Sequence, residues 1–116
     1  MGWHSVTPRL FCDDPKGLVE FLKRTFGATG DFFETRPAEI TIGDSIVMVS
    51  ATGPRAATHS CLYVYVDDVD ATFRRAVEAG GTSVEEPDNM PWGDRRGIVT
   101  DTFGNDWQIA TRNDAG

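Results

Sequence analysis

Three side chains that could take part in catalysis or metal binding lie on one predicted strand near the middle of the chain. His59, Cys61 and Tyr63 are spaced two residues apart in a run, His59 to Val66, that is rich in β-branched and aromatic residues. Because successive side chains of a strand point to opposite faces, all three share one face. An imidazole beside a thiol can form half of a soft metal site or an activated thiolate. No third metal ligand and no orienting carboxylate is evident. The three residues are therefore candidates for catalysis, and the simpler interpretation is that they line a surface.

The composition is that of one soluble globular domain. The chain has 116 residues, of which 40% are hydrophobic and 25% charged. It contains no apolar run of about 18 residues and no secretory signal, so we expect a cytoplasmic protein without a membrane partner. A formal net charge of −7 disfavours a nucleic-acid partner and mildly favours a cationic ligand. Cys12 and Cys61 lack CxxC spacing and are expected to be reduced.

Two amphipathic helices are predicted, each starting at an aspartate. Asp14 precedes Pro15 and an apolar stripe at helical spacing that stops at Gly27. Asp68 precedes a second stripe that stops at Gly80-Gly81. A carboxylate at a helix start accepts backbone N–H bonds and meets the positive end of the dipole. We therefore expect a capping role, and no metal, for the acidic residues at both starts: Asp13, Asp14, Asp67, Asp68 and Asp70.

Each helix has one predicted strand before it and three after it. The predicted strands cover residues 5–12, 31–35, 38–42 and 45–50, and then 59–66, 82–85, 97–101 and 106–111. Gly43-Asp44 and Gly104-Asn105 fit two-residue hairpin turns, and the second copy carries extra residues in a predicted loop, 87–95. This is a βαβββ module repeated once. The prediction is a single α+β domain over 1–116, with module one at 1–52, a linker at 53–57 and module two at 58–116.

The order of these segments resembles the glyoxalase/bleomycin-resistance protein/dioxygenase group, the vicinal oxygen chelate superfamily. The likeness is carried by Val6 to Leu10, Ile42 to Ile46, Tyr65 to Asp70 and the closing segment Met90 to Ala110, and it covers nearly the whole chain. It implies two βαβββ modules forming curled mixed sheets around a groove. It also implies a homodimer, because members commonly pair modules across two subunits.

In metal-dependent members of that superfamily, four strand residues pointing into the groove bind a divalent ion. The matching positions here hold Pro8, Met48, Cys61 and Gln108. Such enzymes use histidine and carboxylate ligands, which an imino acid, a thioether and an amide do not replace. The resemblance is therefore closest to the metal-free bleomycin-resistance-like members, whose first strand also reads Thr-Pro-x-Leu, as Thr7 to Leu10 does. We expect no metal and no cofactor.

The resemblance also makes the groove the ligand-binding site. Aromatic and apolar side chains with one amide suit a flat, partly apolar molecule. Trp107 alternates with Gln108 and is expected beneath a helix, and Arg95-Arg96 is expected either to bind an anionic ligand or to pair with surface carboxylates such as Asp94. The predicted lining consists of Pro8, Leu10, Ile46, Met48, Cys61, Tyr63 and Gln108, with Phe33, Trp92 and Arg96 at the rim.

Together these features predict a metal-free small-molecule binding protein that sequesters an antibiotic or an aromatic or cationic metabolite. The alternative is an enzyme, such as a lyase, an isomerase or a dioxygenase-like protein, that uses the same groove. A third possibility, a structural interaction module, would require a groove filled by the chain's own side chains. The sequence leaves open which ligand is bound and whether any catalysis occurs.

Overall fold

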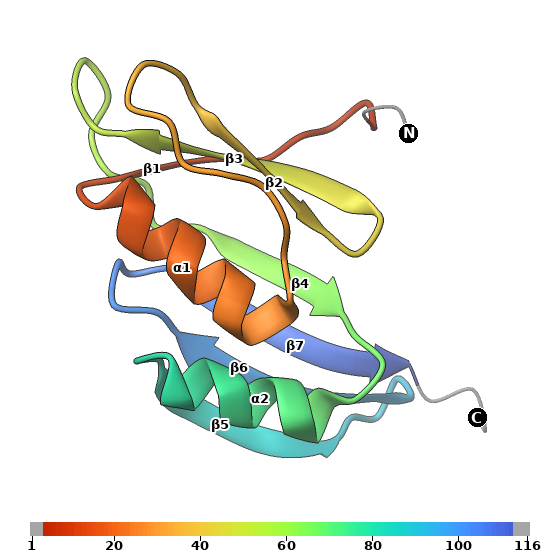
Figure 1. Cartoon of the computed structure of the whole chain (residues 1–116). Coiled ribbons are helices and arrows are strands. Elements are labelled where there is room, and N and C mark those ends of the chain that lie inside the picture. Colours follow the sequence, from red (N-terminus) through yellow and green to blue (C-terminus); the bar gives the residue numbers. More distant parts are fainter. Residues whose placement is uncertain (1–3, 113–116) are drawn as a thin grey trace. The chain divides into compact units, whose positions relative to one another are not determined.

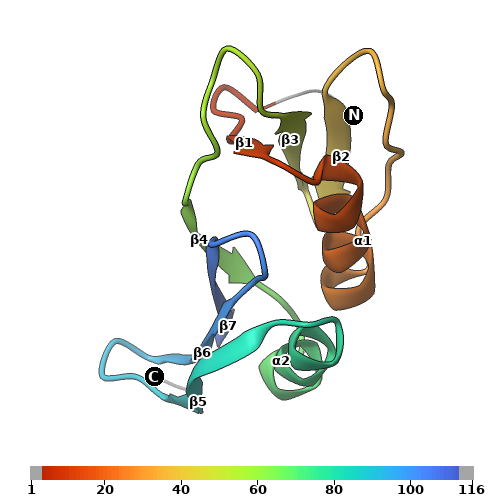
Figure 2. The same cartoon turned by 90° about the vertical axis from the view of Figure 1, so that its left-hand side faces the viewer.

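The computed structural model describes residues 4–112, and its contacts divide the chain into two compact units between His59 and Ser60. Each unit consists of one helix packed on one face of one sheet (Figures 1 and 2). This is the predicted α+β fold with two mixed sheets. Neither helix within the described range is long and apolar enough to cross a membrane.

The first unit is a three-stranded sheet covered by one helix. It comprises β1 (Arg9–Cys12), α1 (Pro15–Phe26), β2 (Ala38–Ile42) and β3 (Ser45–Ala51). The strand order is β1-β3-β2, with β1 parallel and β2 antiparallel to β3. Alternation gives the sheet a buried face and an outer face. The buried apolar face contains Leu10, Cys12, Ala38, Ile40, Ile42, Val47 and Val49.

The second unit has the same plan with one more strand. It comprises β4 (Cys61–Tyr65), α2 (Val69–Glu78), β5 (Thr82–Asn89), β6 (Asp94–Thr100) and β7 (Asp106–Arg112). The order is β4-β7-β6-β5, with β4 parallel to β7 and the other pairs antiparallel. Helix α2 packs on β5, β6 and β7, and Figure 2 shows it lying along one side of the sheet. Trp107, Ile109 and Val99 are fully buried, so the expected position of Trp107 beneath a helix is confirmed.

Both helix starts are capped as predicted. The side chain of Asp14 accepts a hydrogen bond from the Gly17 amide at 3.0 Å, and that of Asp68 accepts one from the Ala71 amide at 3.2 Å. Gly27 ends α1 in the left-handed conformation with φ 66°, which glycine adopts without a side-chain penalty.

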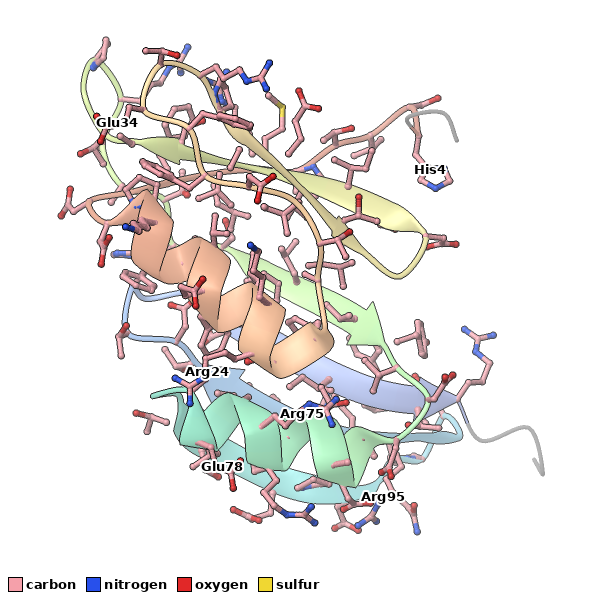
Figure 3. The ribbon with its side chains drawn as sticks, in the orientation of Figure 1. His4, Arg24, Glu34, Arg75, Glu78 and Arg95 are labelled. Atoms are coloured by element: carbon pink, nitrogen blue, oxygen red, sulfur yellow. The ribbon has the colours of Figure 1, made fainter. Side chains whose placement is uncertain are left out.

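Two other aspartates at the helix starts have different partners. Asp70 forms a bidentate ion pair with Arg95, with N–O distances of 2.9 and 3.0 Å. Figure 3 labels Arg95 near the start of α2. Asp13 accepts a hydrogen bond from the Thr52 hydroxyl at 2.9 Å. The expectation of a cap is wrong for Asp13, whose carboxylate contacts Thr52 instead of the start of α1. Asp70 does lie in the first turn of α2, as expected for an acidic residue at a helix start, and its principal partner is Arg95.

Two stretches were assigned wrongly from sequence. Residues 31–35 form no strand; the isolated bridge to β2, between Thr29 and Thr41, lies just before this stretch. Gly30 has φ 126°, and Pro37 lacks an amide donor, so the chain does not continue as a paired strand. Conversely, the predicted loop 87–95 is mostly strand: β5 runs to Asn89 with two register shifts, and β6 begins at Asp94. Pro87 is tolerated because β5 is an edge strand.

The last hairpin is organised by the buried carboxylate of Asp101. Its Oδ1 accepts the amides of Phe103 and Asn105 at 2.8 and 3.0 Å, and its Oδ2 accepts Asn105 Nδ2 at 3.0 Å and Trp107 Nε1 at 2.8 Å. The two strands pair up to Thr100 and Asp106, so the connection spans residues 101–105. The predicted two-residue turn at Gly104-Asn105 is therefore wrong, because the carboxylate stabilises a longer loop.

We predict that Asp101→Asn lowers the free energy of unfolding by about 2–4 kcal/mol, because an amide cannot accept all four donors. Urea denaturation followed by far-UV circular dichroism measures the change. The matched control is Asp88→Asn, at an exposed position on β5, which should leave the midpoint nearly unchanged. Equal midpoints for the two variants would show that Asp101 does not stabilise the hairpin.

Candidate functional site

The outer face of the four-stranded sheet gathers most of the predicted site residues of the second unit. Cys61 and Tyr63 are exposed, whereas Leu62 and Val64 alternate with them toward the helix side. Tyr63 lies opposite Gln108 in the register of β4 and β7. Gln108 Nε2 donates a hydrogen bond to Cys61 Sγ at 3.3 Å, so these three side chains share one face.

Asp94 is the centre of an aromatic cluster on this face. Its Oδ2 accepts hydrogen bonds from the hydroxyls of Tyr63 and Tyr65 at 2.7 and 2.8 Å and from Trp92 Nε1 at 3.3 Å. The two tyrosine rings lie 5.3 Å apart at an interplanar angle of 55°. Asp94 is only 5% exposed, yet Tyr63, Tyr65 and Trp92 are 39%, 49% and 59% exposed. The carboxylate therefore fixes three aromatic side chains whose surfaces remain open.

These contacts change the pKa values of Asp94 and Tyr63. The hydrogen bond from Tyr63 is the main reason why the pKa of Asp94 is lowered, and Tyr65, Trp92 and the charge of Arg112 act in the same direction against the effect of burial. Burial raises the pKa of Tyr63, the Trp92 donation lowers it, and the Asp94 carboxylate raises it further. At neutral pH the Asp94 carboxylate is therefore ionised and the Tyr63 phenol is neutral.

Arg96 joins the aromatic cluster to the amide of Gln108. Its guanidinium donates to Gln108 Oε1 at 3.2 Å and to Glu85 Oε1 at 3.0 Å, and it lies 5.3 Å from the centre of the Trp92 ring. The Nε atom of Arg96 is buried and has no hydrogen-bond partner in the described part of the chain. Gln108 is thus held from both ends, by Arg96 at its oxygen and Cys61 at its nitrogen.

This arrangement does not fit a divalent cation. The amide oxygen of Gln108, the donor atom that a metal would need, is 3.2 Å from a guanidinium that would repel a cation. Within residues 4–112, no group of three or more His, Cys, Asp and Glu side chains is arranged to hold a metal ion.

In the first unit the predicted lining is partly wrong. Leu10 is 1% exposed and belongs to the buried face of the sheet, and by alternation Pro8 shares that face. The outer side chains of β1 are Arg9 and Phe11 instead, and Arg9 lies opposite Met48 in the register. The count from Asp14 gave the wrong alternation, which a one-residue shift reverses along the whole strand.

The other predicted site residues are spread over both units. Met48 and Ile46 are half-buried on the outer face of β3, and Phe33 is 41% exposed with the Arg36 guanidinium 4.1 Å from its ring centre. His59 precedes β4 and is exposed, so the predicted strand start at His59 is wrong. Arg95 forms an ion pair with Asp70. Of the two neighbouring arginines, Arg96 is therefore the one that lies on the outer face of the four-stranded sheet, beside Gln108.

Three residues of this face are absent from the predicted lining. Alternation of the strand does predict that Tyr65 continues the row of Cys61 and Tyr63, and the exposed side chain of Tyr65 agrees with this. Arg112 donates to the Tyr65 hydroxyl at 3.1 Å, and Asp94, expected as a surface carboxylate, is buried. No local pattern indicates that three aromatic donors converge on Asp94, because they come from β4 and from the turn before β6.

Comparison with known families agrees with this architecture. The model of the Glyoxalase/Bleomycin resistance protein/Dioxygenase superfamily matches residues 4–109. The chain belongs to this superfamily. The match spans both helices and almost all of both sheets, so it covers the outer faces described above.

Several solved structures share the superfamily fold. TioX from Micromonospora sp. ML1 is 31% identical, with a TM-score of 0.82 over 96% of this chain and 99% of that one. A hypothetical protein, SA1046 from S. aureus, is 18% identical, with a TM-score of 0.76 over 96% and 95% of the two chains.

The chain is also similar in sequence to an uncharacterised protein of Mycobacterium bovis, which is 29% identical over 90% of this chain and 81% of its own length.

We predict that Asp94→Asn lowers the pKa of Tyr63, because the negative charge that opposes tyrosinate is removed. The chain has two tyrosines, so a Tyr65→Phe background leaves Tyr63 as the sole tyrosine for titration by tyrosinate absorbance. With Asp94 present, the raised pKa means that the contribution of Tyr63 to stability is complete below about pH 10 and is lost as pH rises through the raised value.

The control is Asp106→Asn, which removes a carboxylate of β7 that is hydrogen-bonded to Thr100 instead of a tyrosine. The pKa of Tyr63 should be unchanged in this variant. A shift of equal size in both variants would mean that the overall charge of the protein, and not the adjacent Asp94 carboxylate, sets the proton affinity of Tyr63.

Proposed function

We propose that the protein binds a small molecule containing an aromatic ring on the outer face of its four-stranded sheet, without the help of a metal ion. The observation that carries the proposal is the set of three exposed aromatic side chains held on one buried carboxylate. Aromatic residues with fixed positions offer contact area at little cost in conformational entropy. We propose that this binding serves to sequester an aromatic or cationic antibiotic or metabolite.

The orientation of the cluster favours stacking over hydrogen bonding. The hydroxyls of Tyr63 and Tyr65 and the indole nitrogen of Trp92 already donate to Asp94. What they offer to a ligand is ring surface, with π faces that attract flat rings and cations. Polar recognition would come from the Arg96 and Gln108 side chains at the edge of the same surface. A ligand with a ring and a small polar group suits this combination.

The binding role fits the side chains better than the alternative, an enzyme that uses Cys61. An enzyme of this kind commonly places a base beside the thiol to accept its proton. The group that contacts Cys61 Sγ is the Gln108 amide nitrogen, a donor that cannot accept that proton. Gln108 therefore orients the sulfur but cannot serve as the base.

We predict that Trp92→Ala weakens ligand binding about tenfold or more, because it removes the most exposed ring of the cluster. Trp107→Ala should instead lower stability by about 3–5 kcal/mol, since it opens a cavity beneath α2 and removes a donor to Asp101. A thermal-shift screen of aromatic cations and neutral aromatics supplies ligands, and calorimetric titration compares the variants. Equal losses of affinity with unchanged melting in both would contradict the assignment of the two tryptophans.

We also predict far less than one transition-metal ion per chain in protein purified without a His tag. The reason is the guanidinium beside Gln108 Oε1, together with the absence of carboxylate and imidazole ligands from positions 48, 61 and 108. Elemental analysis after dialysis gives the metal content. Stoichiometric Ni, Zn, Mn or Fe that is lost in Cys61→Ala would overturn the metal-free proposal.

A further inference from the structure

The first unit contains a pocket with two arginines that the proposed function does not use. The pocket has a volume of about 210 Å³, and all of its lining residues belong to the first unit. It shares no residue with the Asp94 cluster. It is bounded by Arg9, the start of α1, the stretch 32–37 and the end of β3. The stretch that fails to form the predicted strand therefore forms one wall.

Both guanidinium groups at this pocket are held in position by neighbouring side chains. Arg9 Nε donates to the Ser50 hydroxyl at 3.1 Å, and its guanidinium carbon lies 4.9 Å from the centre of the Phe11 ring. The Arg36 guanidinium lies 4.1 Å from the centre of the Phe33 ring. The hydrogen bond of Arg9 uses only its Nε, and stacking uses no N–H group, so the terminal nitrogens of both guanidinium groups can donate to a ligand.

Neither arginine is neutralised by a carboxylate. Within residues 4–112 neither Arg9 nor Arg36 forms an ion pair, in contrast to Lys23, Arg95 and Arg96, which pair with carboxylates elsewhere. Two cations that line one small pocket repel each other, and an anion between them removes that repulsion. Glu34, labelled in Figure 3, also lines the pocket and opposes an anion, so the balance at the site is two positive charges against one negative.

The other walls are apolar and define the rest of the ligand. Pro15, Phe33, Pro37 and Val49 contribute apolar surface beside the two arginines. The volume lies below the roughly 300–1,000 Å³ of pockets for drug-sized molecules, so the occupant is small. We propose that this pocket binds a small organic anion, with its carboxylate between Arg9 and Arg36 and its apolar body against Phe33 and Pro37.

The experiment is a two-dimensional NMR titration of the ¹⁵N-labelled full chain with benzoate. The probe combines a carboxylate with a ring, and benzamide is its neutral counterpart of the same shape. We expect saturable shifts of the backbone amides of residues 32–36 and 49–51 with benzoate and none with benzamide. Arg9→Gln and Arg36→Gln should each weaken benzoate binding about tenfold, because each removes one charge-assisted partner.

The matched control is Arg24→Gln, an exposed arginine of α1 that does not line the pocket (Figure 3). It changes the net charge by the same amount and should leave benzoate binding unchanged. Arg9 and Arg36 are also exposed, and the melting temperatures of their variants should match that of the parent protein. An equal loss of benzoate binding in Arg24→Gln would assign the effect to net charge and overturn the proposal.

Three further results would also overturn it. One is the absence of saturable shifts up to about 20 mM benzoate, far above the concentration at which two arginines should bind a carboxylate. Another is a response confined to residues 61–65 and 92–96, which would assign aromatic acids to the face of the Asp94 cluster instead. The third is binding of inorganic phosphate without binding of benzoate, because the apolar wall would then have no role.

Discussion

The second sheet depends on one buried carboxylate. Asp101 accepts four hydrogen bonds, which join the amides of the last connection, the side chain of Asn105 and the indole of Trp107. Asn105 in turn accepts the amide of Ser60, immediately before β4. Because Trp107 is the largest fully buried side chain, fixing its nitrogen also fixes the packing beneath α2. The ends of β4, β6 and β7 are therefore positioned by one charged group that is satisfied inside the protein.

Asp94 plays a comparable part at the other end of β6, with a different consequence. Asp101 gathers donors inside the fold, whereas Asp94 gathers donors whose rings stay exposed. The first carboxylate stabilises the core, and the second organises a surface. A buried charge on the face of a sheet is costly unless it is fully hydrogen-bonded, so the three aromatic donors also explain why Asp94 is tolerated there.

The helices, their caps and the face of β4 could be predicted from sequence because each depends on local chemistry. Asp14 and Asp68 cap their own helices, and alternation alone places Cys61 and Tyr63 on one face. The inward or outward direction of Leu10 could not be fixed in this way, since a strand of four residues with apolar side chains on both faces specifies its register weakly.

Contacts between distant residues were beyond sequence reasoning for a different reason. The pairing of Asp70 with Arg95 and the convergence on Asp94 depend on how β6 lies beside its neighbours. The register shifts in β5 let that strand pass Pro87 and extend a hairpin where polar residues indicated a loop. In each case tertiary pairing overrides the local preference.

The chain of contacts from Trp92 through Arg96 and Gln108 to Cys61 has a practical consequence. Any occupant that moves the Trp92 ring disturbs the guanidinium stacked near it, and through Gln108 it disturbs the hydrogen bond donated to the sulfur. Cys61 is exposed, whereas Cys12, the other thiol, is buried. A fluorescent label attached to Cys61 would therefore lie beside this network, where its emission is expected to report on movement of the tryptophan.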